Sequence, residues 1–452
     1  MLSLTCLGGA GTVTGSKYLL SHADMHLLVD CGLFQGLKNL RELNWQALPI
    51  EPAHIAAVVL THAHLDHCGY LPRLVADGFK GKIYCTPASR DVAELILLDS
   101  AKLQEKDAEF ANRKGFSKHN PALPLYRVMD AEKALARFSP IPLHTAVPLP
   151  GAGHLLLRRA GHILGAASAQ IDLGGSRFVF SGDLGRFDDA VMHDPERVMQ
   201  ADYVIVESTY GNRRHAATDS LQALGAVIER TVRRGGTVVI PAFAVGRAQT
   251  LIHALWRLWQ QGGRQRVPVY LDSPMAISAT ELLEKYGNEH KLSPQECRAA
   301  CAAVTYVRDV EESKALSANR FPKIIISASG MATGGRVLHH IAAFGGDHRN
   351  TLLFSGFQAA GTRGRKLLNG AGEIKLFGQW LTINAEIAEL PMLSAHADSD
   401  ELMRWLSGFR HAPRGVFIVH GEPEASEALR ERIQRELGWQ ATVPLPGRRY
   451  EL

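Results

Sequence analysis

Short apolar segments that end in small or polar residues dominate the first part of the chain. Segments of this kind lie at residues 2–9, 16–21, 25–32, 154–161, 168–174 and 176–183. The apolar residues 56–60 lead into a histidine-rich turn, and a helical pattern then stops near Gly78. A second helical pattern covers residues 89–113. The first part is therefore predicted to be rich in sheet, with a strand–loop–helix unit and a longer helix.

A different pattern begins at Tyr203, where strand-like and helix-like segments alternate. The strand-like segments lie at residues 202–208, 236–243, 267–273, 323–329 and 351–357. This alternation predicts a parallel sheet covered by helices on both faces. Short β-like segments return after Gly372, and a helix is expected at residues 424–436. We therefore expect an α/β domain at residues 201–372, inserted into a first domain formed by residues 1–200 and 373–452.

Composition narrows the class of protein only slightly. The chain has 452 residues, 46% of them hydrophobic, which is typical of a globular protein. A formal net charge of +5 suits a polyanionic partner, but many basic proteins bind no nucleic acid. The six cysteines form no CxxC pair, and we find neither a targeting signal nor an apolar run of membrane-spanning length. These features favour a cytoplasmic protein without a membrane segment.

The strongest local signal is a group of four potential metal ligands within six residues. His62, His64, Asp66 and His67 follow an apolar strand at the point where the backbone turns. Imidazole and carboxylate groups are the ligands that zinc takes in catalytic sites. The alternative is a polar turn that contains histidines by accident, and the density of the cluster argues against it.

This cluster resembles the HxHxDH signature of the metallo-β-lactamase superfamily. Asp30 in LLVDCG, His162 in AGHILGA and Asp183 in FSGDLG stand in the order of that superfamily's other motifs. Taken singly, a His or Asp after a strand is more often a capping or turn residue. The resemblance implies an α/β fold with an αββα sandwich.

The resemblance also implies two zinc ions per chain. The implied ligands of the first zinc are His62, His64 and His162, those of the second are Asp66 and His67, and Asp183 bridges the two. Asp30 would hold a ligand or the attacking water by a hydrogen bond. A zinc pair lowers the pKa of water from about 16 to roughly 7, so a metal-bound hydroxide would be the nucleophile.

Three later motifs resemble the β-CASP branch of this superfamily, which acts on nucleic acids. Glu207 lies in VESTYG, His396 in LSAHAD and His420 in IVHGE. The similarity is greatest to bacterial relatives of the endonuclease subunit of the eukaryotic pre-mRNA 3′-end cleavage factor. It implies that His420 completes the second zinc site, which goes with RNA substrates. His396 would be the general acid and Glu207 would hold its ring, although a helix-cap neighbour and a strand-end carboxylate are the alternatives.

We therefore expect a zinc-dependent ribonuclease with the inserted β-CASP domain, cutting single-stranded RNA internally, with His396, Glu207, Asp66 and Asp30 as its catalytic residues. The alternatives are a small-molecule metallo-hydrolase, a DNA nuclease and a non-catalytic RNA-binding relative. The residues alone leave open whether cleavage is internal or starts from a 5′ end. Exposed strand edges of such a fold are compatible with a homodimer.

Glycine-rich turns after strands of the α/β domain are the candidate RNA contacts. Backbone N–H groups can approach phosphates at such turns, although glycine also serves turn geometry alone. The candidate residues are Ser329, Gly330, Met331, Ala332, Arg247 and Arg363. The pair His339–His340 has no carboxylate nearby in the sequence, so we expect a packed or solvated pair.

Overall fold

The computed structural model describes residues 2–115, 119–216, 219–263 and 265–452. The chain forms two compact units. Unit 1 comprises Met1–Asp189, His193–Arg214 and His396–Leu452, and unit 2 comprises Ala190–Met192 and His215–Ala395. None of the described helices combines the length and apolar character that crossing a bilayer requires.

The first sheet of unit 1 has seven strands in the order β22-β1-β2-β3-β4-β5-β6. Their bounds are β1 (Leu2–Gly8), β2 (Lys17–His22), β3 (Met25–Val29), β4 (Ile55–Val59), β5 (Lys82–Cys85), β6 (Phe138–Pro140) and β22 (Arg449–Glu451). The strands from β22 to β3 pair antiparallel, and those from β3 to β6 pair parallel.

The second sheet of unit 1 also has seven strands, in the order β21-β20-β11-β10-β9-β8-β7. Their bounds are β7 (Val147–Leu149), β8 (Gly153–Arg159), β9 (Ala167–Leu173), β10 (Ser176–Phe180), β11 (Tyr203–Glu207), β20 (Gly415–Val419) and β21 (Ala441–Thr442). The strands from β7 to β10 pair antiparallel, and those from β10 to β21 pair parallel.

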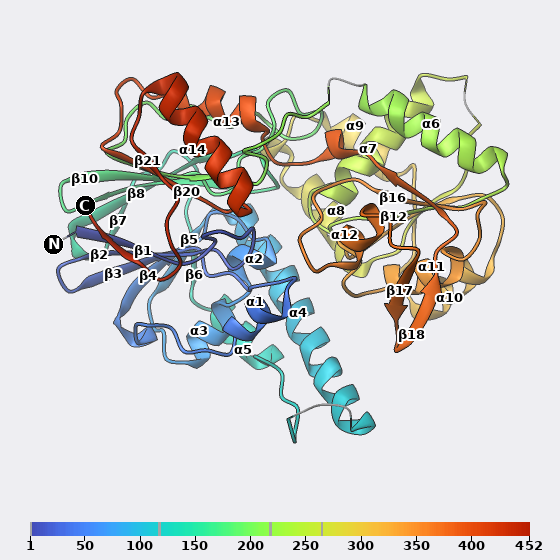
Figure 1. The fold of residues 1–452 in the computed structure, drawn as a ribbon, viewed down its shortest axis with the longest axis horizontal. Coiled ribbons are helices and arrows are strands. Elements are labelled where there is room, and N and C mark those ends of the chain that lie inside the picture. The colour runs from blue at the N-terminus through green and yellow to red at the C-terminus, as the bar shows by residue number, and fades with distance from the viewer. Residues whose placement is uncertain (1, 116–118, 217–218, 264) are drawn as a thin grey trace. The chain divides into compact units, whose positions relative to one another are not determined.

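The two sheets of unit 1 share one apolar core. Leu4, Leu20 and Val59 of the first sheet are buried in one cluster with Ile171 and Phe178 of the second. Helices lie on the outer faces, α3, α4 and α5 beside the first sheet and α13 and α14 beside the second (Figure 1). The helix bounds are α1 (Lys38–Leu43), α2 (Leu65–Cys68), α3 (Leu71–Ala76), α4 (Pro87–Lys114), α5 (Val128–Leu135), α13 (Ser399–Leu406) and α14 (Pro423–Leu437). Unit 1 is therefore an αββα sandwich, as the sequence predicted.

Unit 2 contains a six-stranded parallel sheet in the order β14-β13-β15-β12-β16-β19. The bounds are β12 (Val238–Pro241), β13 (Val269–Leu271), β14 (Thr305–Tyr306), β15 (Ile324–Ser327), β16 (Thr351–Phe354) and β19 (Glu386–Glu389). A separate hairpin consists of β17 (Glu373–Leu376) and β18 (Gln379–Thr382).

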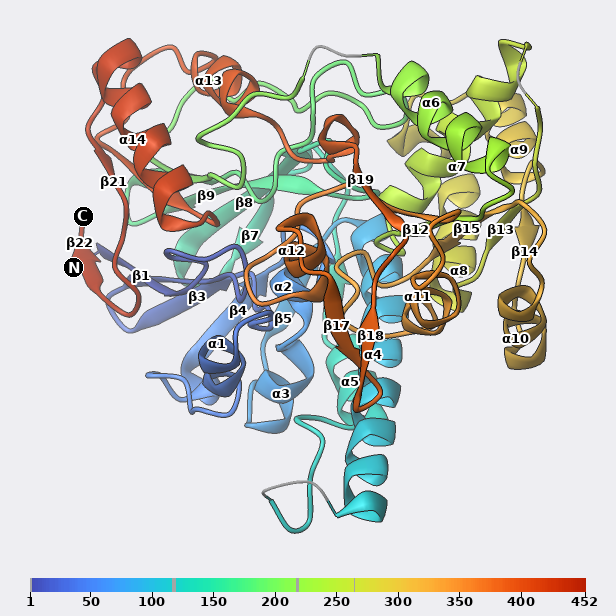
Figure 2. The same cartoon turned by 45° about the vertical axis from the view of Figure 1, so that its right-hand side comes forward.

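Helices cover both faces of the parallel sheet, as Figure 2 shows. The bounds are α6 (Ser220–Arg233), α7 (Arg247–Gln260), α8 (Pro274–Lys285), α9 (Pro294–Cys301), α10 (Val310–Ala318), α11 (Val337–Phe344) and α12 (Arg363–Leu368). Successive strand residues alternate between the two faces. Val238 and Ile240 pack in one cluster with α6 to α9, whereas Val239 packs in the other with α10 to α12. This arrangement confirms the parallel sheet expected from the alternating pattern.

Two assignments of strands to the sheets were wrong. β11, expected in the parallel α/β sheet, lies in unit 1 between β10 and β20, where Tyr203 and Ile205 complete the shared core. β17, β18 and β19, expected to complete the first domain, lie in unit 2. β19 pairs with β16, and Ile374 and Leu376 of β17 are buried against α11 and α12. The burial of these apolar side chains explains both differences.

Candidate active site

The expected metal ligands lie where strands of unit 1 end. His62 follows β4, His162 follows β8, and Asp183 follows β10. His420 follows β20, and its φ of 49° is positive. Asp30 follows β3 and also has a positive φ, of 57°. Strained backbone of this kind clusters at functional sites.

A first group of ligand atoms surrounds one point. His64 Nδ1 lies 3.2 Å from both His62 Nε2 and His162 Nε2. Asp183 Oδ2 lies 3.4 Å from His62 Nε2 and 3.6 Å from His162 Nε2. The ligand atoms of all four residues lie within 4.8 Å of one another, so the group can hold one metal ion.

A second group consists of Asp66, His67 and His420, whose ligand atoms are equally close. His420 Nε2 lies 3.3 Å from Asp66 Oδ2. The other carboxylate oxygen of Asp183, Oδ1, lies 3.3 Å from His67 Nε2. Asp183 therefore presents one oxygen to each group.

Asp30 fixes the orientation of His67. Its carboxylate accepts hydrogen bonds from the Thr61 backbone N–H at 2.8 Å and from the Thr61 hydroxyl at 2.9 and 3.0 Å. Asp30 Oδ2 lies 2.8 Å from His67 Nδ1, which directs Nε2 of the same ring toward Asp183. A ligand histidine held by a carboxylate in this way keeps one tautomer and one ring orientation.

His396 lies beside both groups and faces Glu207. Its Nδ1 atom is 3.2 Å from Glu207 Oε2, and its ring centroid is 4.4 Å from that of His162. Glu207 is fully buried and accepts the Leu184 backbone N–H at 2.6 Å. Glu207, Asp183 and His420 also form a third group with ligand atoms within 4.8 Å. Glu207 is thus within reach of metal ligands as well as of His396.

The site is more open on one side than on the other. The side chains of His62, His67, His162 and Asp183 are each 1% exposed. Those of Asp66 and His396 are 19% and 16% exposed. Solvent therefore reaches the group from the side of Asp66 and His396.

The protonation of the site suits a metal ion. Burial lowers the pKa of His62 to about 3 and that of His64 to about 4, so both rings are neutral at ordinary pH. Neutral imidazole is the form that binds metal. Burial also lowers the pKa of His67, but Asp183 and Asp30 outweigh it and raise that pKa well above its ordinary value. A cation bound between His67 and Asp183 would take the place of the proton that the raised pKa favours on His67.

The donor set also fits zinc on hydrogen-bonding grounds. The buried atoms His67 Nε2 and Asp183 Oδ1 lie 3.3 Å apart as an ion pair, but within the part of the chain that the structure describes neither makes a well-formed hydrogen bond. A buried polar atom left in this state costs about 1–3 kcal/mol. Coordination to a cation would satisfy both atoms, and imidazole with carboxylate is a zinc ligand set.

Comparisons with known proteins agree with this geometry. Residues 10–261 match the metallo-beta-lactamase superfamily. The chain is 36% identical over 431 residues to Ribonuclease TTHA0252 of Thermus thermophilus, covering 93% of this chain and 94% of that protein.

The chain belongs to the metallo-β-lactamase superfamily.

Residues 248–367 of this superfamily member match the Beta-Casp domain. Residues 380–444 match the Zn-dependent metallo-hydrolase RNA specificity domain. The chain is also 32% identical over 453 residues to the transcription termination factor FttA of Methanosarcina mazei, covering 96% of this chain and 69% of that protein. A crystal structure of a protein of unknown function from Enterococcus faecalis is similar in fold, with a TM-score of 0.54 at 13% identity over the full length of both chains. This metallo-β-lactamase superfamily protein is therefore a Zn-dependent metallo-hydrolase with β-CASP and RNA specificity domains.

Some residues that support the site were not identified from the sequence. Thr61 holds Asp30, and the Thr209 hydroxyl lies 3.1 Å from His420 Nδ1. Both threonines are sequence neighbours of motif residues, and this position is the signal that could have identified them. Lys17 is buried, and its ammonium donates to the Gly32 carbonyl. No local pattern marks Lys17, because its partner is on another segment.

The candidate RNA contacts lie together in unit 2. They follow β12, β15 and β16, which are neighbours in the parallel sheet. Gln358 Nε2 donates to the carbonyls of Gly330 and Gly356, joining two of the turns. Arg247 is only 6% exposed. Arg363 donates to the carbonyls of Ala332, Thr333 and Lys375, so its guanidinium holds the turn in place. Direct RNA contact by these residues stays a prediction.

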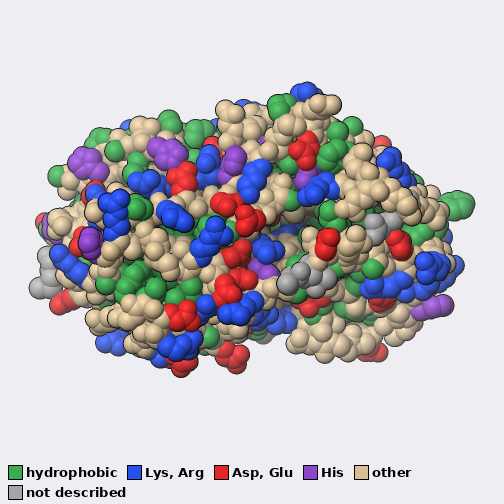
Figure 3. Space-filling model, turned by 90° about the horizontal axis from the view of Figure 1, so that it is seen from above, with side chains coloured by type: hydrophobic (Ala, Val, Ile, Leu, Met, Phe, Trp, Pro, Cys, Tyr) green, Lys and Arg blue, Asp and Glu red, His purple; other side chains and the backbone are tan. Residues whose placement is uncertain are grey.

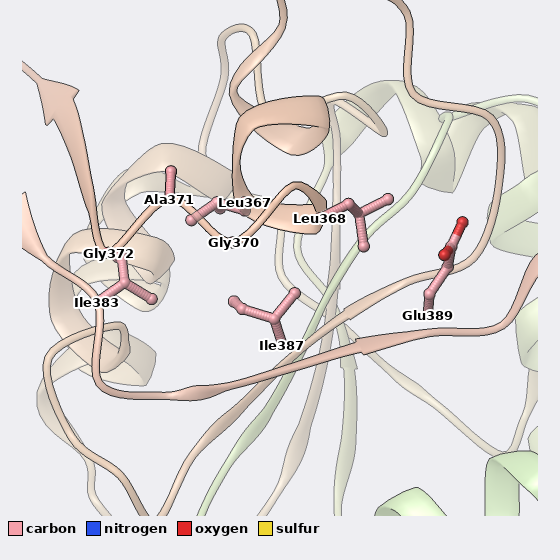
Figure 4. A pocket seen from close by; sticks show the side chains of 8 residues that line it. All are labelled: Leu367, Leu368, Gly370, Ala371, Gly372, Ile383, Ile387 and Glu389. Carbon is pink, nitrogen blue, oxygen red and sulfur yellow. The ribbon is translucent and has the colours of Figure 1, made fainter.

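The surface charge is mixed. Lys and Arg side chains are interspersed with Asp and Glu side chains on the face drawn in Figure 3. In unit 2 a hollow of about 420 Å³ lies beside α12 and β19 (Figure 4). Leu367, Leu368, Ile383 and Ile387 line it together with glycine backbone and the carboxylate of Glu389. Such a lining does not favour a phosphate group.

Proposed function

We propose that this protein is a ribonuclease that cuts single-stranded RNA internally and holds two zinc ions per chain. The observation that carries the proposal is the position of His396, which faces Glu207 beside two adjoining groups of metal ligands. The match to an RNA specificity domain and the identity to a ribonuclease support RNA as the substrate.

Two groups of ligands would hold the zinc ions. His62, His64 and His162 would bind the first ion, and Asp66, His67 and His420 the second, with Asp183 shared between them. Bound zinc supplies Lewis-acid activation of water and of phosphoryl oxygens. Asp30, together with Thr61, keeps His67 in the orientation that this requires.

His396 would protonate the leaving group. Its Nδ1 faces Glu207, so Nε2, on the other side of the ring, would give the proton to the departing 3′-oxygen of the RNA. Burial lowers the pKa of His396, but the carboxylate of Glu207 outweighs burial and raises that pKa above its ordinary value. The raised pKa keeps the ring protonated to higher pH than in an ordinary histidine, which suits a general acid. Its partly exposed side chain can reach a bound substrate.

The test is cleavage of one RNA oligonucleotide, labelled in turn at its 5′ and 3′ ends, by the zinc-loaded protein. The variants Asp183→Ala and His396→Ala and a DNA oligonucleotide of the same sequence are run alongside. We expect internal RNA products from the wild type and a loss of at least about 100-fold in kcat in each variant. Zinc content is measured for all three proteins, and we expect His396→Ala to retain it.

Other outcomes distinguish the competing functions. Mononucleotides released from the 5′ end would show an exonuclease, and equal cleavage of DNA would show a nuclease without sugar preference. Intact RNA with the zinc-loaded wild type would contradict the proposal and favour a small-molecule hydrolase or a non-catalytic RNA-binding protein.

A further inference from the structure

The β17–β18 hairpin of unit 2 is separate from the parallel sheet (Figures 1 and 2). It exposes two aromatic side chains. Ile374 and Leu376 on one face are buried against α11 and α12. The other face carries Lys375 directly opposite Trp380. Trp380 is 68% exposed, and Phe377 at the turn is 59% exposed. Large aromatic side chains are normally among the more buried residues of a protein.

Phe377 occupies a backbone position that disfavours it. The two central residues of the turn, Phe377 and Gly378, have φ angles of 49° and 85°. Turns of this kind favour Asn or Asp at the first position, because bulky side chains rarely adopt positive φ. The ring of Phe377 stacks on His339 with centroids 4.6 Å apart. The contact with His339 thus holds the Phe377 ring at the tip of the hairpin despite the positive φ.

The hairpin is joined to the glycine-rich turns. Arg363 Nε donates to the Lys375 carbonyl, and Arg363 Nη1 donates to the carbonyls of Ala332 and Thr333. These two carbonyls belong to the turn that follows β15. The carboxyl ends of strands form the edge at which open parallel sheets bind ligands. Phe377 and Trp380 thus adjoin the side of unit 2 where a ligand is expected.

We propose that Trp380, with Lys375 directly opposite it, and Phe377 at the tip of the hairpin form a stacking platform for the bases of single-stranded RNA. This platform rests on the proposed ribonuclease function and extends it to substrate binding in unit 2. Exposed aromatic rings bind successive bases of any sequence by stacking, and a neighbouring cation meets the backbone. Glu373 shares the exposed face with Lys375, so the surface is not strongly basic. Stacking rather than charge therefore provides the binding, which makes it weakly dependent on salt.

The test compares Trp380→Ala and Trp380→Phe with a matched control, Phe321→Ala. Phe321 is 78% exposed in the same unit and precedes β15, at the opposite edge of the sheet. With zinc-loaded protein and a single-stranded RNA, we expect Trp380→Ala to raise KM about 10-fold at unchanged kcat. Trp380→Phe retains most of the affinity, and Phe321→Ala changes neither constant. The increase in KM persists when salt is raised.

Two further measurements identify stacking. An RNA with abasic nucleotides in its central positions binds the wild type more weakly, and Trp380→Ala adds no further loss with that RNA. RNA is expected to quench the tryptophan fluorescence of the wild type. The contribution that comes from Trp380 is absent from Trp380→Phe, so the total quenching is smaller in that variant.

The possible failures are distinct. If wild type and Trp380→Ala cleave RNA with the same KM and show the same fluorescence quenching, the proposed stacking platform is contradicted. The proposed ribonuclease function would still stand. Quenching that depends on Trp380 without cleavage would support the platform and contradict the ribonuclease. A mass that falls from dimer to monomer in Trp380→Ala, at unchanged RNA affinity, would show that the hairpin is a subunit interface instead.

Discussion

Glu207 controls the charge of His396 across a distance of 3.2 Å. The raised pKa of His396 means that its acid form persists to higher pH than in an ordinary histidine and is lost as the pH rises through that pKa. Glu207→Gln removes the negative charge, so we expect the alkaline limb of kcat to move to lower pH. The measurement is kcat for RNA cleavage against pH.

A matched control for this shift is Glu196→Gln. Glu196 Oε2 lies 2.7 Å from His144 Nε2, in an exposed pair with no part in the site. The alkaline limb of kcat against pH for Glu196→Gln is expected to coincide with that of the wild type. Coincident limbs in Glu207→Gln and wild type would show that Glu207 does not act through the proton of His396.

Lys17 makes the stability of unit 1 depend on pH. Its ammonium lies 4.6 Å and 4.7 Å from the ring centroids of Phe34 and Tyr70, and burial lowers its pKa from 10.5 to about 8. The unfolded chain binds this proton more tightly, so stability rises as the pH goes from about 8 to 10.5. The 2.5-unit difference corresponds to about 3 kcal/mol, at roughly 1.4 kcal/mol per unit.

Denaturant unfolding of the metal-free protein at pH 7.5 and pH 10 measures this effect. The free energy of unfolding of wild type is expected to rise relative to that of Lys17→Met, which has no titrating group at the position. An equal change with pH in both proteins would contradict the prediction.

The site residues differ in how far the sequence reveals them. His62, His64, Asp66 and His67 lie within six residues, so their spacing alone predicts a metal site. Residues whose partners are distant in sequence give no such signal. His340, for example, looked like half of a packed pair, but the fold places its Nε2 atom 2.6 Å from Asp272 Oδ2, 68 residues away. Only the tertiary structure supplies that carboxylate.

The short helix α2 depends on a glycine of a neighbouring loop. A Cβ atom at Gly32 would lie 1.6 Å from the Asp66 carbonyl oxygen and 2.6 Å from the His67 backbone nitrogen. Gly32→Ala must displace α2, and with it two of the expected ligands. We expect less zinc per chain, measured by atomic absorption, and a loss of stability of about 1–3 kcal/mol.

Gly415→Ala serves as the control for this change. A Cβ atom at Gly415 would meet its nearest atom, in Tyr203, at an ordinary contact distance of 3.5 Å. This variant is expected to bind as much zinc as the wild type. Full zinc content in Gly32→Ala would mean that the loop can move without disturbing α2.

The sequence predicts which segments form helices and strands better than it predicts which strands pair with one another. The helices expected at residues 89–113 and 424–436 are α4 and α14, each within two residues of the expected bounds. β11 and β19 were also expected as strands, but in the wrong sheets. An apolar run indicates that a strand is buried without indicating which strand lies beside it.

At the scale of the whole molecule, metal removal should act on one unit. The residues that form all three candidate metal groups belong to unit 1. Zinc bound to the folded state at 100 times its Kd stabilises that state by about 2.7 kcal/mol. We expect a chelator to lower the Tm of the unfolding transition of unit 1 and leave that of unit 2 in place, as measured by calorimetry.

Asp183→Ala provides the control, because it removes the carboxylate shared by two groups. The chelator is expected to have little effect on the Tm of this variant. Equal shifts of both transitions in the wild type would contradict the assignment of the metal to unit 1.

The order of the expected ligands along the chain would also set when the proposed nuclease becomes active during its synthesis. Asp183 and His420 are separated by the whole of residues 215–395, which form unit 2. At about 5–20 residues per second, the ribosome needs on the order of tens of seconds to make this stretch. Until His396 and His420 emerge, the nascent chain has neither its expected general acid nor a complete second metal group. The proposed nuclease, assembled in this order, would be unable to cut the messenger RNA from which it is being translated until most of that message has been read.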